Sequence, residues 1–329
     1  MAPKYDAKTT ATELVQDLAN EIKGKVVLIT GVSPGGLGDT FATSIAKAHP
    51  ALLILTGRTA SKVQEAADAI TKANPDVKTR VLQLDLGSLA AVQKSAAEVQ
   101  EWADVPAIDV LVNNAGIMAV PYALSPDGVE SQLATNHLGP FLFTNLIMDK
   151  ILAAKEPRVV NISSDGHRLC PGIRFGDHNF HDGETYDKWM SYGQSKTANM
   201  LMAISLAEKL GPKRGLTAVS LHPGVIFSTS LANHMDADSD FPALTALDKK
   251  MGNREAWEGL KVKTADEGVA THVYGAFHPE LKEYNGAYLQ DAHVADPWTE
   301  TVKSWGTSSV EAERLWKLSE KLVGQEFAY

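Results

Sequence analysis

Short apolar runs alternate with amphipathic stretches through most of the chain. The runs at 25–30, 52–56 and 108–112 consist mainly of valine, leucine and isoleucine. Runs of this length and composition are typical of strands buried on both faces of a parallel sheet. By the same reading, further strands are predicted at 79–84, 158–162, 216–221 and 286–289.

Between these strands, apolar residues recur at helical spacing. The pattern predicts helices over 12–22, 41–48, 61–73, 127–153, 264–277 and 310–322, with two more that begin near Ser88 and at Tyr192. Strands and helices that alternate in this way predict an α/β fold, a Rossmann-type doubly wound parallel sheet of about seven strands with helices on both faces. The expected architecture has three layers, α/β/α.

The alternation continues without a break, so the 329 residues are predicted to form one domain. No linker rich in proline, serine and glycine and no internal repeat divides the chain. Residues 1–22 form a helical extension before the first strand. Residues 230–263 are the least regular stretch and are the expected substrate lid.

A glycine-rich turn, Gly31 to Gly38, joins the first strand to the following helix. The order strand, glycine turn, helix lets backbone N–H groups and a helix N-terminus hold a pyrophosphate. A plain glycine turn is the alternative, and the flanking elements favour the nucleotide site.

The residue after the second strand selects between the two nicotinamide dinucleotides. In this architecture a carboxylate binds the ribose 2′-hydroxyl of NAD, whereas an arginine accommodates the 2′-phosphate of NADP. Arg58 follows the strand and no acid stands there. The sequence therefore favours NADP(H), with Ser33 as a second candidate for the phosphate.

Polar residues also follow the next two strands. Asp85 is expected either to accept a hydrogen bond from the adenine amino group or to cap the helix near Ser88. The sequence Asn113-Asn114-Ala115-Gly116 closes the fourth strand. Its small residues suit close approach of a cofactor, and its amides suit bracing of the neighbouring strand.

The long helical pattern 127–153 contains a proline, Pro140. Proline has no N–H, so the carbonyl of Asn136, four residues earlier, loses its normal partner. A kink that exposes this carbonyl is predicted, where it would bind a water that feeds protons to Lys196. The adjacent His137 is expected to be a packed or surface histidine.

Tyr192 and Lys196 are four residues apart and point from one face of a helix. An ammonium beside a phenol favours the phenolate, and such a pair suits proton transfer to or from the oxygen of an alcohol or carbonyl. Ser164, at the carboxyl end of the fifth strand, is placed to donate to that oxygen. It is preferred to Ser163, because it lies further past the strand.

Composition narrows the other classes of partner. The net charge is −9 and no basic stripe occurs, so nucleic acid is not an expected partner. The irregular spacing of His167, His178 and His181 argues against a metal site. The single cysteine, Cys170, fits a reducing compartment and has no base at local spacing. The sequence has neither a signal-peptide core nor a transmembrane run, and the cytosol is the expected compartment.

Taken together, these motifs resemble classical-type short-chain dehydrogenases/reductases. The matching residues are Thr30-Gly31 with Gly36-Leu37-Gly38, Asn113 to Gly116, Asn136, Ser163-Ser164, Tyr192-x-x-x-Lys196 and Pro223-Gly224. The retinol dehydrogenase and WW-domain oxidoreductase-like branch is similar in Val160 to His167, Lys263-Thr264-x-x-Glu267-Gly268 and Leu315 to Glu320. Two differences are a glycine loop one residue longer than the family's usual one and no run typical of the membrane anchor of retinol dehydrogenases.

The resemblance implies a role for each matching residue. Tyr192 would be the general acid/base, Lys196 would bind the nicotinamide ribose and lower the tyrosine pKa, Ser164 would hold the substrate oxygen, and Asn136 would anchor the relay water. The implied cofactor contacts are Gly31, Ser33, Gly36, Leu37, Gly38, Arg58, Asp85, Leu86, Asn114, Ala115, Gly116, Tyr192, Lys196, Pro223, Gly224, Val225 and Thr229.

The implied reaction is NADP(H)-dependent interconversion of an aldehyde or ketone with its alcohol. A carbon–carbon double-bond reductase, similar to the protochlorophyllide reductases, is one alternative. A non-catalytic NADP-sensing protein and an interaction protein are the others. The expected partner is a small molecule, and a homo-oligomer is left open.

Overall fold

The computed structural model describes residues 4–329, and its centre is one sheet with the strand order β3-β2-β1-β4-β5-β6-β7-β8. The strands are β1 (Val26–Ile29), β2 (Leu52–Gly57), β3 (Lys78–Gln83), β4 (Val110–Asn113), β5 (Arg158–Ile162), β6 (Thr217–His222), β7 (Tyr288–Gln290) and β8 (His293–Val294). All pairs are parallel except β7 with β8. The doubly wound fold is confirmed, with the two-residue β8 as an additional edge strand.

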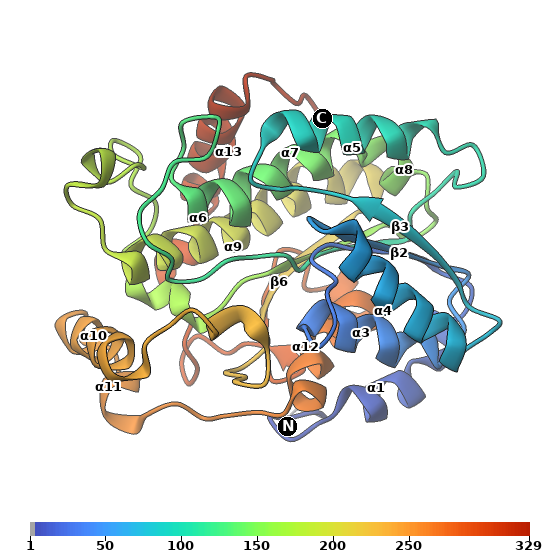
Figure 1. Ribbon diagram of the computed structural model, residues 1–329, viewed down its shortest axis with the longest axis horizontal. Helices are drawn as coiled ribbons and strands as arrows, with labels where there is room; N and C mark the ends of the chain where they lie inside the picture. Colours follow the sequence, from blue (N-terminus) through green and yellow to red (C-terminus); the bar gives the residue numbers. More distant parts are fainter. Residues whose placement is uncertain (1–3) are drawn as a thin grey trace.

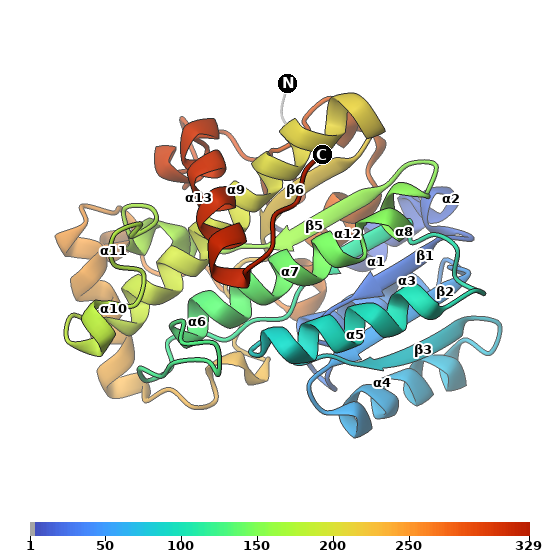
Figure 2. The ribbon, with the colours of Figure 1, turned by 90° about the horizontal axis from the view of Figure 1, so that it is seen from above.

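Helices cover both faces of the sheet (Figure 1). One face carries α1 (Ala11–Asp17), α2 (Ala19–Ile22), α3 (Leu37–Ala46), α4 (Ala60–Ala73) and α12 (Ala265–Phe277). The other carries α5 (Leu89–Glu101), α6 (Ser131–Leu133), α7 (Gly139–Leu146), α8 (Met148–Leu152), α9 (Lys188–Arg214) and α13 (Ser309–Val323). The view from above shows α5, α7, α9 and α13 packed side by side over the strands (Figure 2).

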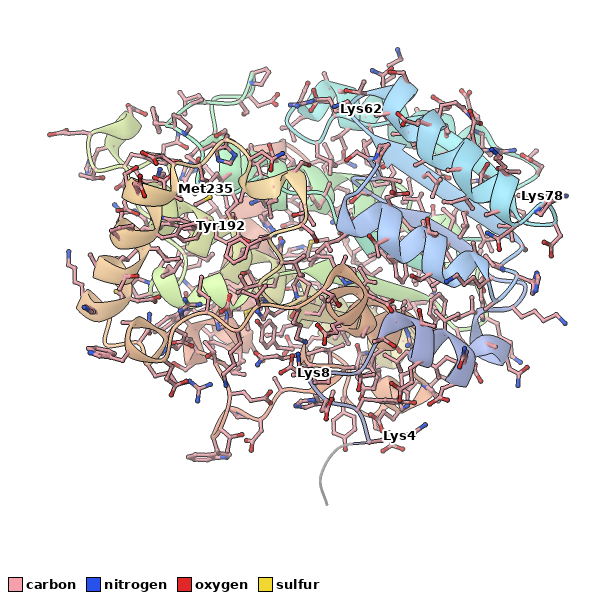
Figure 3. The ribbon with its side chains drawn as sticks, turned by 60° about the horizontal axis from the view of Figure 1, so that its bottom comes forward. Lys4, Lys8, Lys62, Lys78, Tyr192 and Met235 are labelled. Carbon is pink, nitrogen blue, oxygen red and sulfur yellow. The ribbon has the colours of Figure 1, made fainter. Side chains whose placement is uncertain are left out.

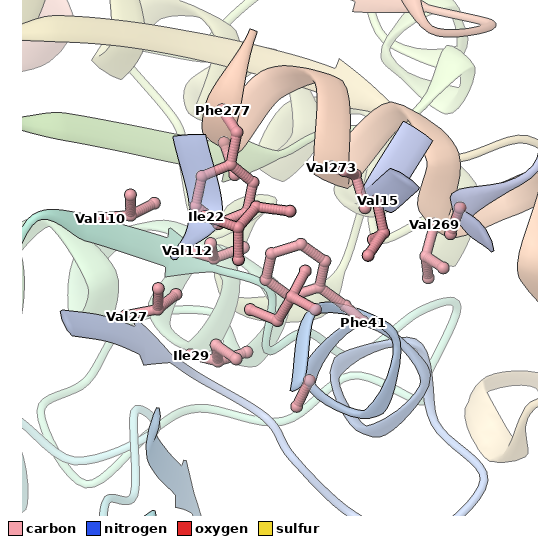
Figure 4. Close-up of a cluster of buried hydrophobic side chains, with 14 of the residues drawn as sticks. Val15, Ile22, Val27, Ile29, Phe41, Val110, Val112, Val269, Val273 and Phe277 are labelled. Carbon is pink, nitrogen blue, oxygen red and sulfur yellow. The ribbon is translucent and has the colours of Figure 1, made fainter. Parts of the chain in front are cut away.

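The helices of the first face are held by a continuous apolar cluster (Figure 4). Val269, Val273 and Phe277 recur every four residues, so α12 presents one apolar stripe to the sheet. Val27 of β1 belongs to the same cluster, and Val15 of α1 extends it to the N-terminal helices. Full burial of each such side chain contributes about 1.5–3 kcal/mol. The extension 1–22 is therefore part of the core from Tyr5 onwards.

Buried amides fix the register at the centre of the sheet. The Asn113 Nδ2 group donates to Asn161 Oδ1 at 2.9 Å and to Thr144 Oγ1 at 3.0 Å. Because a buried amide without a partner is costly, these bonds hold β4, β5 and α7 in a single alignment. The carboxyl ends of the central strands are thereby brought together at one edge.

Two sequence expectations need correction. The pattern at 127–153 is not one helix but α6, a π-helical turn over Ala134–Leu138, α7 and α8. The segment 230–263 was expected to be irregular, but it contains α10 (Ala237–Lys250) and α11 (Glu255–Glu258). Pro242 inside α10 masks the helix in the sequence, and few of its residues are buried because the helix lies away from the sheet (Figure 1).

Candidate active site

A cavity of about 710 Å³ lies at the carboxyl ends of the central strands. It is lined by residues that follow β1, β2, β3, β4, β5 and β6, together with α9 and the segment 223–244. The lining includes every predicted cofactor contact except Gly38: Gly31, Ser33, Gly36, Leu37, Arg58, Asp85, Leu86, Asn114, Ala115, Gly116, Tyr192, Lys196, Pro223, Gly224, Val225 and Thr229. Ser164 lines the same cavity, whereas Asn136 lies just behind it.

The extra residue of the glycine loop is absorbed in a tight turn. The backbone N–H of Gly36 donates to the carbonyl of Ser33 at 2.9 Å, and Gly35 has a φ of +76°. Proline followed by a glycine with positive φ fits a type II turn, and Pro34-Gly35 occupies its two central positions. Gly36 then caps α3, so the helix N-terminus still faces the cavity.

Gly31 and Gly38 are required by close approach of the backbone. A Cβ at Gly31 would lie 2.6 Å from the Ala115 Cα, and one at Gly38 would lie 2.7 Å from the Asn114 amide nitrogen. That amide donates to the carbonyls of Thr30 and Gly31 at 2.8 and 3.2 Å. The predicted bracing of a neighbouring strand by these amides is therefore present, at the end of β1. It holds the glycine turn in a conformation that suits a dinucleotide phosphate.

The adenosine end of the cavity contains Arg58 and Asp85. Arg58 is exposed, and no side-chain hydrogen bond or ion pair within residues 4–329 engages its guanidinium. Asp85 does not cap α5; Ser88 does, and the Asp85 carboxylate accepts the N–H of Gly87 at 3.0 Å. The alternative of a helix cap is therefore wrong, and the contact of Asp85 with the adenine amino group stays a prediction.

Asn136 lies in the π-helical turn before Pro140. In this turn the N–H of Gly139 donates to Ala134, five residues earlier, so the helix is irregular where Pro140 predicts a kink. The Asn136 side chain is fully used: Oδ1 accepts from Ile117 N–H at 2.8 Å, and Nδ2 donates to the Ile117 carbonyl and to Ser195 Oγ at 2.9 Å each. Its role as a relay anchor stays a prediction.

Tyr192 and Lys196 project from the second and third turns of α9 (Figure 3 labels Tyr192). Asp187 caps this helix by accepting the N–H groups of Trp189 and Met190. The Lys196 ammonium lies 5.5 Å from the centre of the Tyr192 ring and donates to the Ile162 carbonyl at 3.0 Å. Because Tyr192 and Lys196 are four residues apart, both project from one face of α9, and Lys196 contacts the end of β5.

The loop after β5 brings Ser164 against the phenol. A Cβ at Gly166 would lie 2.8 Å from the Tyr192 ring and 3.2 Å from Ser164 Oγ, so the absent side chain lets the two approach. Ser163 instead donates to the Lys196 backbone carbonyl at 2.7 Å. The Ser163 hydroxyl is therefore engaged with the backbone of α9, and the choice of Ser164 as the substrate-binding serine stays a prediction.

The pKa of Tyr192 is shifted in the direction opposite to the one expected from its neighbour Lys196. Burial raises the pKa of Tyr192 to about 12, although a hydrogen bond with Ser164 acts in the opposite direction. Burial lowers the pKa of Lys196 to about 8. A lysine that lowers the tyrosine pKa was expected, but in the protein alone desolvation outweighs every favourable contact.

Sequence reasoning missed a charged cluster beside Ser164. The Ser164 hydroxyl donates to Asp165 Oδ1 at 3.2 Å, and Asp165 pairs with Arg168 at 2.7 Å and lies 3.6 Å from His222. Burial opposes ionisation of Asp165, yet His222 and Arg168 lower its pKa to about 2. The short spacing of Asp165 and Arg168 was visible in the sequence, but Asp248, the partner of Arg168 in α10, was not.

The remaining candidates are structural. His137 is buried against Ser319, and burial lowers its pKa to about 3. Burial raises the pKa of the Cys170 thiol to about 12, so it is not an activated nucleophile. Residues 4–329 contain no cluster of side chains suited to a metal ion, and none of their helices has the length and hydropathy to cross a membrane.

Comparison with known proteins decides the family. The short chain dehydrogenase family profile matches residues 25–172. The short-chain dehydrogenase TIC 32 A, chloroplastic, of Brassica napus is 33% identical over 97% of this chain and 94% of its own length. The chain belongs to the short-chain dehydrogenase family. Mouse retinol dehydrogenase 11 is 31% identical over 92% of this chain and 88% of its own length.

Solved structures of short-chain dehydrogenases share the fold. An uncharacterized protein from Mycobacterium paratuberculosis has a TM-score of 0.68 and 31% identity, and the match covers 94% of this chain and 98% of that one. A gluconate 5-dehydrogenase from Burkholderia cenocepacia, solved with NADP and tartrate, has a TM-score of 0.61 and 22% identity over 83% of this chain and 96% of its own. Members of this family are nicotinamide-dependent oxidoreductases, and the glycine cradle described above fits such a cofactor.

Proposed function

We propose that this short-chain dehydrogenase interconverts a carbonyl and an alcohol with NADP(H), and that Tyr192 is its general acid/base. The observation that supports this most is the meeting of Tyr192, Ser164 and Lys196 in one cavity with the glycine turn. None of these side chains is more than 9% exposed. Burial of polar and charged groups costs free energy, and such groups gathered at one cavity are candidates for a functional site.

The nicotinamide, when bound, supplies the hydride in reduction and accepts it in oxidation. In reduction, Ser164 holds the carbonyl oxygen and Tyr192 donates its phenolic proton to that oxygen. A pKa near 12 keeps the proton on Tyr192 at neutral pH, which suits the acid in the reductive direction. In oxidation the phenolate must form, and a positive charge on Lys196 favours it.

The dinucleotide is held by the glycine turn and by the residues after β2, β3, β4 and β6. Arg58 is exposed at the cavity with its guanidinium free of partners in the described part of the chain. Because an arginine at this position suits a 2′-phosphate, NADP(H) is favoured over NAD(H). Ser33 lies in the same lining and would be a second ligand.

The substrate end of the cavity is apolar. Met118, Leu169, Trp189, Phe241 and Leu244 line it, beyond the catalytic side chains. Figure 3 shows Met235 of the same lining close to Tyr192 in the projected view. The substrate is therefore proposed to have a bulky apolar body attached to its carbonyl or carbinol carbon.

Measurement of NADPH consumption over a panel of aldehydes, ketones and enones tests this function. We expect turnover of apolar aldehydes or ketones, with an alcohol product identified by mass spectrometry. Tyr192→Phe keeps the ring but removes the proton, so its rate should fall by about 10²–10⁴-fold, while NADPH affinity changes little. A saturated ketone as the only product from enones would instead show double-bond reduction.

Near-wild-type turnover by Tyr192→Phe would contradict the mechanism. NADPH binding without turnover of any panel member would favour an NADP-sensing protein. The cytosol as compartment remains part of the proposal, and fractionation of cells that express the native chain would test it.

A further inference from the structure

The side chain that joins the catalytic loop to the substrate lid is a buried arginine, Arg168, which is only 2% exposed. It lies in the 3₁₀ turn Asp165–Leu169 directly after Ser164. Its Nε and Nη2 groups donate to the two carboxylate oxygens of Asp248 at 2.9 Å each. Its Nη1 group pairs with Asp165 at 2.7 Å.

The partners of Arg168 come from the two lid helices. Asp248 lies in the last turn of α10 and is 2% exposed, and Glu255, at the start of α11, lies 3.6 Å from the guanidinium. Between them, Asn253 donates to the Arg168 carbonyl at 3.3 Å and to Asp248 Oδ1 at 2.9 Å. The backbone and the side chain of Arg168 therefore contact α10, α11 and the turn between them.

This arginine is not placed to bind a substrate anion. The fork of its guanidinium is occupied by two carboxylates, and a third lies nearby. The carboxylates of Asp248 and Asp165 occupy the groups of the guanidinium that an anionic ligand would need. Stability alone does not explain the cluster either, since buried ion pairs are often no better than apolar packing.

The position of the cluster offers a better account. Phe241 and Leu244, which line the substrate end, lie on α10 within two turns of Asp248. Leu169 and Trp189, on the opposite side, pack with Leu244 in a small apolar cluster. This cluster is separate from the two larger cores beside the sheet, so the lid has little other apolar area to hold it.

We propose that Arg168 is a positioning residue that fastens α10 and α11 to the loop of Ser164 and thereby sets the shape of the substrate end of the cavity. Through its ion pair with Asp165, the residue after Ser164, the same guanidinium also holds the backbone of the loop that carries the serine. The proposal rests on the function proposed above, because it assigns the apolar end of that cavity to the substrate.

Arg168→Gln tests whether this side chain fastens α10 and α11 to the loop of Ser164. Its kcat/KM for a bulky apolar substrate should fall by about tenfold to a hundredfold, mainly through KM, while a small aldehyde is affected much less. The Kd for NADPH should stay within about twofold of wild type, since the glycine turn and Arg58 are untouched. Backbone amide hydrogen exchange should accelerate in 237–258 but not in α3 or α4.

Arg158→Gln is the matched control. Arg158 is also a buried arginine, but its guanidinium donates to the carbonyls of Gly275 and His278 at the opposite end of β5. Its loss should lower the melting temperature without changing the ratio of activities on bulky and small substrates. Arg168→Lys keeps a charge but not the bidentate fork and should restore the ratio only in part.

If Arg168→Gln does not fold, Asp248→Asn weakens the same ion pair from the side of α10. It should show the same change in the ratio of activities on bulky and small substrates, and the same faster hydrogen exchange in 237–258. Unchanged specificity and unchanged exchange in the folded variant would overturn the proposal. If the wild type turns over no carbonyl compound, the proposed function fails, but the exchange measurement still decides whether Arg168 holds the lid.

Discussion

Burial shifts the pKa of the Tyr192 phenol upwards and the pKa of the Lys196 ammonium downwards. Their pKa values, about 12 and about 8, move towards neutrality of each group rather than towards an ion pair. Four residues of separation on a helix bring the two together, but spacing contains no information about desolvation. Proximity was therefore predictable from the sequence, whereas the direction of the tyrosine shift was not.

Arg58→Ala should remove much of the preference for NADPH over NADH. The side chain is exposed at the cavity, so its replacement does not disturb the core. We expect NADPH affinity to fall by about tenfold, of the order of one charge-assisted contact, and NADH affinity to stay nearly unchanged. Titration of both nucleotides by isothermal calorimetry measures this. Equal affinities in the wild type would show that Arg58 does not select the cofactor.

Lys196→Met should stabilise the nucleotide-free protein at neutral pH. Burial lowers the lysine pKa from 10.5 to about 8, so between these values the unfolded chain binds the proton more strongly and wild-type stability rises with pH. The variant should gain up to about 3 kcal/mol at pH 7, less the lost hydrogen bond to Ile162. Urea unfolding at pH 7 and pH 10 should show the two proteins converging, while NADPH binding weakens in the variant. A gap that widens with pH would contradict the buried-ammonium assignment.

At the level of elements, the glycine turn and the π turn both give the backbone a conformation that a regular helix does not have. The first was readable because Pro34-Gly35 has turn chemistry. The second was only partly readable: Pro140 predicts an irregularity, but nothing in the local sequence distinguishes a kink from a π turn. The strands were predictable within about two residues, since their apolar runs are buried on both faces. α10 was not, since its partners are supplied by the loop of Arg168 rather than by the sheet.

Gly31→Ala and Gly35→Ala form a matched pair for the glycine turn. Both residues have positive φ, +72° and +76°, so both variants carry a similar backbone strain of about 1–2 kcal/mol. Only Gly31 has a close neighbour, the Ala115 Cα at 2.6 Å, whereas nothing lies within 4 Å of a Cβ at Gly35. Thermal unfolding and NADPH titration should show a much larger loss for Gly31→Ala. Similar losses in both would mean that strain alone limits this turn.

On the scale of the whole molecule, buried neutral histidines tie stability to pH. Burial lowers the pKa of His137, His167 and His272 to about 3, 4 and 4. Their stabilisation is complete above the unfolded pKa of about 6.5 and is lost as the pH falls towards 4, because only the unfolded chain then takes up the protons.

Together the three histidines should steepen acid unfolding by up to about 4 kcal/mol per pH unit. His272→Leu should reduce this slope by about a third. Urea unfolding at pH 7, 6 and 5 measures both slopes. Equal slopes in wild type and His272→Leu would show that His272 is protonated in the folded state.

The contacts around the loop after Ser164 also determine how much of the chain must be synthesised before that loop is supported. Strands β1 to β4, with the glycine turn and Arg58, lie within the first 113 residues. The turn after Ser164, in contrast, receives Asp248 from 80 residues further along, and Trp305 donates to the His167 carbonyl from 138 residues further along. A nascent chain released at residue 240 would contain the nucleotide edge but neither Asp248 nor Trp305, the two supports of the turn after Ser164. Translation therefore has to pass Trp305 before the loop after Ser164 can make all these contacts, and chains released earlier lack some of its supports.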